Sequence, residues 1–285
     1  MSQNASFSQR NHFASIPLPL VPGEMPEKLR LELEDVLVRE YEEGIKNFLN
    51  DGKAANWDKV LGRIWVRIFG MSRTVGIKAL CIEECSRRIK CHAPDKVLTL
   101  IEELAKLIGE KQPSFQKEVN EVLSYHQAPY ILHCSSEKGW MMIQTGSEVD
   151  RDNILQCLSD LKDPAFEKTR EHFEKAGRLL SKQEYAESVG QSIKAFEACL
   201  RKLANRPTLW GIYVLEECDK KFNLPLPLKE SMKDMFKYRN DAEDVGHSKK
   251  EGSTCPVPDR WDAQLVYTLI ASYIAYLVSK CRDKK

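Results

Sequence analysis

The sequence predicts a mainly α-helical protein in two parts: an N-terminal helical domain with a small β-hairpin, residues 1–146, and a C-terminal helical domain, residues 147–285. Three observations support this fold class. A chain of 285 residues is long enough for two domains of ordinary size. Apolar residues recur at spacings of three and four along most of the chain, which is the period of amphipathic helices. Only one short segment, 129–145, has a residue pattern typical of β-strands.

The composition is that of a soluble globular protein. Hydrophobic residues make up 42% of the chain and charged residues 30%, which excludes a disordered chain. Lys and Arg number 43 against 42 Asp and Glu, so no global basic field attracts nucleic acid, and a site for a polyanion must be local. The longest apolar stretch, 265–278, is too short and too polar for a membrane span, so we expect no membrane partner.

The cysteines and the N-terminus indicate a cytoplasmic protein. Nine cysteines cannot all pair within one chain, and the first ten residues are polar without a secretory segment. Cys81, Cys85 and Cys91 lie in a helical pattern and lack the paired spacing of structural zinc sites. We therefore expect free thiols and no metal. No glycine-rich phosphate loop is present, and no cofactor is expected.

The first half begins with an arm and continues as helices. Prolines recur between residues 17 and 26, so the arm over 1–26 is expected to be extended. Helices are expected at 27–51, 57–69, 73–91, 95–110 and 114–126. Two short strands joined by a turn at Gly139 are expected over 129–145.

The second half is expected to be entirely helical. Helices are expected at 148–161, 164–180, 184–204, 208–221, 228–238 and 260–281, with a polar loop over about 240–259. Ser181 and Glu184 have the spacing of a capping box. Small residues lie beside the apolar stripe of the third helix, at Ser188, Ser192, Ala195 and Cys199. They allow another helix to approach closely, either from this chain or from a second copy.

The segment 238–248 contains the residues best suited to chemistry. Arg239 and Asn240 lie at a predicted helix end, and His247 follows in the polar loop, where no apolar stripe explains it. An arginine presents a charged planar fork to a phosphate and stabilises negative charge in a transition state. A histidine titrates near neutrality, so it can remove a proton from a 2′-hydroxyl or return one to the leaving oxygen. The alternative is an exposed histidine and an arginine paired with a nearby acid, Asp241, Glu243 or Asp244.

This segment resembles the motif of the HEPN family, helical bundles whose active members are metal-independent endoribonucleases. The resemblance lies in Arg239-Asn240…His247 and in the upstream segment 187–197, which is similar to the family's glutamate-bearing helix. It implies a HEPN-like bundle that forms a two-fold homodimer, with Arg239 and His247 of both subunits lining one cleft. In this interpretation His247 transfers protons, Arg239 holds the scissile phosphate, Asn240 orients His247 or the RNA, and Glu197 lies behind the motif.

The N-terminal half resembles the AbiJ-type domains of bacterial abortive-infection proteins, which are fused to HEPN-like domains. The similar residues are 6–11, the proline-rich arm and 25–30. The resemblance implies a toxin that cleaves RNA in antiviral defence, with an antitoxin or a phage-derived trigger as a further partner. Seven residues separate Arg239 from His247, whereas active motifs usually have four to six. A non-catalytic HEPN-fold module for RNA binding, dimerisation or regulation is therefore the alternative.

A basic cluster near the end of the third expected helix is a second candidate. Arg87, Arg88 and Lys90 lie within four residues of one another. Such a cluster can contact RNA phosphates. The alternative, which such clusters more often represent, is the solvated end of a helix.

Overall fold

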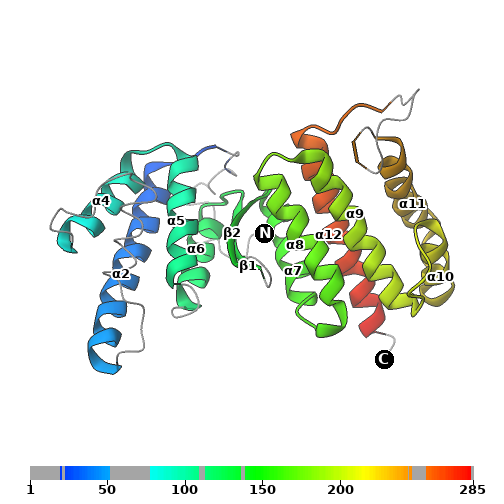
Figure 1. The fold of residues 1–285 in the computed structure, drawn as a ribbon, viewed down its shortest axis with the longest axis horizontal. Helices are drawn as coiled ribbons and strands as arrows, with labels where there is room; N and C mark the ends of the chain where they lie inside the picture. The colour runs from blue at the N-terminus through cyan, green and yellow to red at the C-terminus, as the bar shows by residue number, and fades with distance from the viewer. Residues whose placement is uncertain are drawn as a thin grey trace, which may run out of the picture. The chain divides into compact units, whose positions relative to one another are not determined.

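The computed structural model describes residues 20, 23–51, 78–108, 113–135, 139–242, 244–245 and 255–283. Over these residues the chain is mainly helical with one two-stranded antiparallel hairpin, which confirms the coarse fold class (Figure 1). The expected helix at 57–69 and most of the expected arm lie outside the described residues. The chain divides into two compact units, Met1–Met142 and Ile143–Lys285.

The first unit is formed by helices that bury one apolar stripe each. Its elements are α2 (Glu27–Asp51), α4 (Lys78–Cys91), α5 (Pro94–Ile108), α6 (Pro113–Tyr125), β1 (Tyr130–Ser135) and β2 (Gly139–Gln144). In α2 the expected stripe is the buried face, with Leu29, Leu33 and Val36 almost fully covered. In α5 the buried residues recur from Val97 to Ile108 at helical spacing. The periodicity of the sequence therefore identified the core of this unit correctly.

The hairpin is stabilised by side chains of the first unit. The amide of Asn120 in α6 bonds both backbone groups of Leu132, donating to its carbonyl at 2.9 Å and accepting its N–H at 2.8 Å. On the other strand, Glu102 of α5 accepts the N–H of Met142 at 2.8 Å. An isolated two-stranded hairpin is only marginally stable in water, so these contacts satisfy edge groups that have no third strand.

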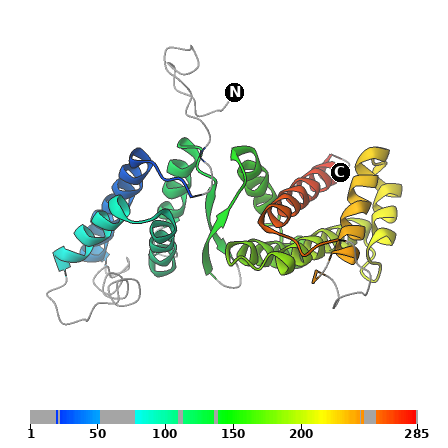
Figure 2. The ribbon, with the colours of Figure 1, turned by 90° about the horizontal axis from the view of Figure 1, so that it is seen from above.

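The second unit is organised around one central helix. Its elements are α7 (Glu148–Asp160), the 3₁₀ turn η1 (Pro164–Phe166), α8 (Glu167–Ser181), α9 (Tyr185–Ala204), α10 (Ile212–Phe222), α11 (Leu226–Asp241) and α12 (Arg260–Arg282). Helix α9 packs against α8, α10, α11 and α12 (Figures 1 and 2). Helix α12 also contacts α7 and α8. Any residue of α9 that faces several neighbours can therefore tie them together.

The small residues of α9 belong to the interior of the unit. Ser188 donates its hydroxyl proton to the carbonyl of Ala176 in α8 at 2.9 Å. Ser192, Ala195 and Cys199 are also fully buried. The small side chains thus allow α8 and other helices of the same chain to approach closely, and this strip is not a surface for a second copy.

Several helix ends differ from the expected ones. The capping box at Ser181 is wrong, because Ser181 remains in α8 and its hydroxyl donates to the carbonyl of Gly177 at 3.0 Å. Glu184 precedes α9 without a side-chain cap. Helix α10 begins at Ile212 rather than 208, because Gly211 has a φ of 58°. Helix α11 begins at Leu226, since a proline within the first turn is tolerated.

Four of the eight described thiols are buried, as expected from their apolar helical positions. Cys85, Cys157, Cys199 and Cys218 are buried, whereas Cys91 and Cys134 are exposed. Burial raises the pKa of Cys218 to about 12, so this thiol stays protonated at neutral pH. Among the described helices, none combines the length and the hydropathy needed to cross a bilayer.

Gly177 of α8 is required by the close approach of α12. A Cβ atom at this position would lie 2.8 Å from the hydroxyl oxygen of Tyr267. Tyr267 is fully buried, and its ring stacks on Phe173 with centroids 4.5 Å apart, so the ring has no room to retreat. The contact between Gly177 and Tyr267 therefore sets the distance between these helices.

We predict that Gly177→Ala lowers the free energy of unfolding by about 1–3 kcal/mol through overpacking, despite the better helix propensity of alanine. In a Tyr267→Phe background the clashing oxygen is absent, so the same substitution should cost clearly less. Urea unfolding of the full chain, followed by circular dichroism, measures both effects. An equal cost in the two backgrounds would contradict this role of the hydroxyl contact.

Candidate functional site

Arg239 lies in the last turn of α11 and is held by two neighbours. Its side chain is 16% exposed, and its Nη1 atom lies 3.5 Å from Oε2 of Glu197 in α9. Its Cζ atom lies 6.0 Å from the ring centroid of Phe236, one turn earlier in α11. A carboxylate and an aromatic face both stabilise a guanidinium. The side chain is therefore oriented while part of it still reaches solvent.

Glu197 is a buried carboxylate with three partners. The residue is 7% exposed. Its Oε1 atom accepts the backbone N–H of Gly211 at 2.6 Å and lies 3.3 Å from Nη2 of Arg201. Its Oε2 atom faces Arg239. A buried carboxylate is tolerated only when its oxygens are paired, so Glu197 requires all these elements to be in place.

The structure brings Arg239 and Glu197 together and places Asn240 beside them. Asn240 is exposed at the last turn of α11. His247 lies outside the described residues. The chain on either side of it is fixed at its base, because Ala242 and Cys255 form a parallel bridge. Ala242 directly follows α11, so this bridge lies at the end of that helix.

Val245, the last described residue before His247, lies against α9. A Cβ atom at Gly190 would lie 3.0 Å from the carbonyl oxygen of Val245, so a larger residue would push this backbone slightly away from the helix. Val245 is two residues before His247 in the sequence. Gly190 and Glu197 are about 10 Å apart along the axis of α9. The segment leading to His247 and the Arg239–Glu197 pair therefore lie against the same helix.

Tyr238 lies at the base of the same loop. Burial raises the pKa of its phenol to about 12, and the charges of Asp262, Cys255 and Asp259 act in the same direction. The phenol is therefore neutral at physiological pH. It lies next to Arg239 in the sequence without adding a charge to the site.

The basic cluster of α4 is paired with carboxylates. Glu84 accepts two hydrogen bonds from Arg87 and one from Arg88, each at 2.7 Å. Mainly through the bond from Arg87, the pKa of Glu84 falls to about 2. Lys90 lies 2.9 Å from a carboxylate oxygen of Glu34 in α2. The three cations therefore face two carboxylates, which weakens the field they present to solvent.

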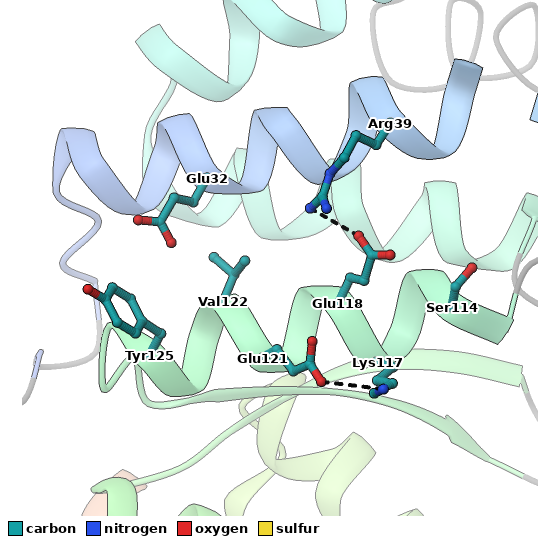
Figure 3. Close-up of a pocket in the computed structure, with 8 residues that line it drawn as sticks. All are labelled: Glu32, Arg39, Ser114, Lys117, Glu118, Glu121, Val122 and Tyr125. Atoms are coloured by element: carbon teal, nitrogen blue, oxygen red, sulfur yellow. Dashed lines mark ion pairs between the residues drawn. The ribbon is translucent and has the colours of Figure 1, made fainter. Parts of the chain in front are cut away.

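A groove in the first unit contains none of the predicted site residues. It has a volume of about 430 Å³ and lies between α2 and α6 (Figure 3). Arg39 of α2 lies 3.1 Å from Glu118 of α6, and Lys117 lies 3.7 Å from Glu121 (Figure 3). Because these charges pair with one another, the groove has the character of a polar helix contact.

A second groove lies in the second unit, where η1 and the start of α8 meet the end of α9. Its volume is about 400 Å³. Three cations line it, Lys168, Arg201 and Lys202, against one acid, Glu167. Arg201 connects this groove to Glu197 and hence to Arg239. Neither the groove nor Arg201 was singled out from the sequence.

No group of three potential metal ligands occurs within the part of the chain that the structure describes. That part includes Cys85, Cys91 and His92, but not the side chain of Cys81. Comparisons of the chain with protein-family models, curated proteins and solved structures found no significant match.

We predict that Glu197→Ala lowers the free energy of unfolding by about 2–3 kcal/mol, because it leaves Arg201, Arg239 and the N–H of Gly211 without their shared acceptor. Glu197→Gln should cost less, since its amide oxygen still accepts the N–H of Gly211. Glu187→Ala, an exposed position on the same helix, is the control and should change stability by less than about 0.5 kcal/mol. Chemical unfolding measures all three, and equal effects at positions 187 and 197 would contradict the network.

Proposed function

We propose that this protein is a metal-independent endoribonuclease of the HEPN type that acts in bacterial abortive infection. The observation that carries the proposal is the position of Arg239. It is oriented by Glu197 and lies at the base of the loop that contains His247. In this proposal the second unit is the HEPN-like bundle, the first unit is the AbiJ-like domain, and a homodimer acts as a toxin controlled by an antitoxin or a phage-derived trigger.

The proposed reaction uses only side chains that the two subunits of the homodimer supply. His247 of one protomer removes the proton of a ribose 2′-hydroxyl, and the 2′-oxygen attacks the adjacent phosphorus. The bond from phosphorus to the 5′-oxygen breaks, and His247 of the partner subunit donates a proton to this leaving oxygen. The products are a 2′,3′-cyclic phosphate and a 5′-hydroxyl, so no metal or cofactor is consumed.

Arg239 and its neighbours would serve the phosphate in this reaction. A guanidinium carries five N–H donors, and the contact with Glu197 engages only one of its nitrogens. The remaining donors could bind the phosphate oxygens as negative charge develops. Glu197 would hold the orientation of Arg239, and the exposed Asn240 would contact His247 or the RNA.

The same geometry favours a second candidate function. Arg239 is mostly buried, paired with Glu197 and packed on Phe236, which is also how an arginine holds two helices together. In that case the bundle is a non-catalytic module for RNA binding, dimerisation or regulation. Cleavage of RNA distinguishes the two functions.

We predict that the purified protein cleaves total RNA and tRNA in the presence of EDTA and leaves 2′,3′-cyclic phosphate ends. His247→Ala and Arg239→Ala should slow cleavage by at least about 100-fold, because each removes a group that acts in the transition state. Denaturing gels and end analysis provide the measurement. The control variant Lys237→Ala lacks an exposed cation of the same helix and should cleave RNA at the wild-type rate.

Expression in bacteria tests the same proposal in cells. The wild type should slow growth and degrade RNA, whereas the His247→Ala protein should be tolerated. Equal toxicity of the two proteins with no difference in RNA integrity would exclude catalysis by His247. Cleavage that EDTA abolishes would exclude a metal-independent reaction.

We also propose that Arg87, Arg88 and Lys90 provide a secondary contact with RNA phosphates. Replacing all three by alanine should reduce the slope of log affinity against log salt by less than about 2, because single-stranded contacts contribute about 0.7 each and carboxylates compete here. Glu84→Gln removes the main competitor and should raise RNA affinity. Filter binding at several salt concentrations measures both changes, and an unaltered slope in the triple variant would exclude this contact.

A further inference from the structure

The connection between α9 and α10 presents two exposed aromatic side chains. Trp210 is 61% exposed, and Tyr213, in the first turn of α10, is 67% exposed. Single exposed apolar residues are common on protein surfaces and need no explanation. The backbone on both sides of Trp210, however, is hydrogen-bonded to side chains of α9, which an incidental surface residue does not require.

Both peptide groups of Trp210 are bound by side chains of α9. Arg201 donates from Nε to the carbonyl of Leu209 at 2.6 Å, on the N-terminal side of Trp210. Glu197 accepts the N–H of Gly211 at 2.6 Å, on its C-terminal side. Glu197 and Arg201 are one helical turn apart and pair with each other. The indole is therefore exposed on a rigid support.

Arg201 connects the backbone beside Trp210 to a basic groove. Arg201 also lines the groove of about 400 Å³ at the end of α9, together with Lys168 and Lys202. Lys168 and Lys202 are exposed and form no ion pair among the residues that the structure describes. Arg206, four residues before Trp210, is 61% exposed and lies 3.8 Å from Glu217. Exposed aromatic faces beside unpaired cations are typical of surfaces that bind single-stranded nucleic acid.

The aromatic surface is linked directly to the proposed catalytic arginine. One oxygen of Glu197 accepts the N–H of Gly211, and the other faces Arg239. A single carboxylate thus separates Arg239 from the backbone that carries Trp210. These contacts of 2.6 Å and 3.5 Å hold the backbone next to Trp210 close to the guanidinium of Arg239.

We propose that Trp210 and Tyr213, with the cations Lys168, Arg201 and Lys202, form a binding site for single-stranded RNA beside Arg239. A base stacks on the indole, and the adjacent phosphates contact the cations. A duplex is excluded from this site, because both faces of its internal bases are covered by their neighbours. This inference rests on the proposed function and specifies its substrate class.

The test measures binding separately from cleavage. The probe is a fluorescent oligouridylate with 2′-O-methyl groups, which cannot undergo attack by the 2′-oxygen. We expect Trp210→Ala to weaken binding by the full chain about 5- to 150-fold, as for other base–aromatic stacks, and Trp210→Phe to retain most of the affinity. Anisotropy gives the affinities, and circular dichroism verifies that each variant is folded.

Two controls define the site. Trp261→Ala removes another exposed tryptophan of the same unit, 63% exposed on α12, and should leave the affinity unchanged. Lys202→Glu should weaken binding without disturbing the Trp210 support. A duplex of the same sequence should bind more weakly and should not respond to Trp210→Ala.

The failure of this inference can be separated from the failure of the proposed function. If Trp210→Ala and the wild type bind the probe equally, or if Trp261→Ala has the same effect, the site is excluded whether or not RNA is cleaved. If binding depends on Trp210 but no RNA is cleaved, only the proposed catalysis is excluded. If RNA is cleaved and Trp210→Ala leaves KM unchanged, only the binding site is excluded.

Discussion

The arrangement of the second unit depends on the pairing of one buried carboxylate, that of Glu197. A charged oxygen that leaves water loses several kcal/mol of solvation unless protein groups replace it. At Glu197 these groups come from three places: the backbone of Gly211, the guanidinium of Arg201 and the guanidinium of Arg239. The requirement to pair this one side chain therefore positions the connection to α10 and the end of α11 against α9.

The packing of α9 makes such a position possible. Small residues on one side let α8 lie close, with Ser188 bonded to a carbonyl of α8. Gly190 leaves room for the backbone at Val245. Glu197 and Arg201 then occupy the turns that face α10 and α11. One helix thus provides the core of the unit and the supports for both candidate RNA contacts, Arg239 and Trp210.

The charge distribution agrees with a local site rather than a basic surface. The formal net charge of the chain is only +1. The cations of α4 face carboxylates of their own unit, whereas Lys168 and Lys202 line a groove with a single acid, Glu167. An enzyme that binds one short strand needs only a few such charges, since broad coating of RNA requires many phosphate contacts. A near-neutral chain is therefore compatible with the proposed ribonuclease.

The sequence by itself determined the helices, their buried faces and the position of the hairpin, because the spacing of apolar residues is a local property that each element carries in its own segment. It also pointed to Arg239 through its chemistry at a predicted helix end, and to Glu197 through a resemblance. The sequence also contains two features of the Trp210 support, the one-turn spacing of Glu197 and Arg201 and the glycine after Trp210. Neither feature indicates a contact until the fold brings these residues together. Only the tertiary structure decided that Ser188 and Ser192 are internal, that α10 begins after Gly211 and that the backbone beside Trp210 is bonded to α9. These features depend on contacts between residues that are distant in the sequence or on helices that meet in space, and no local pattern encodes such contacts.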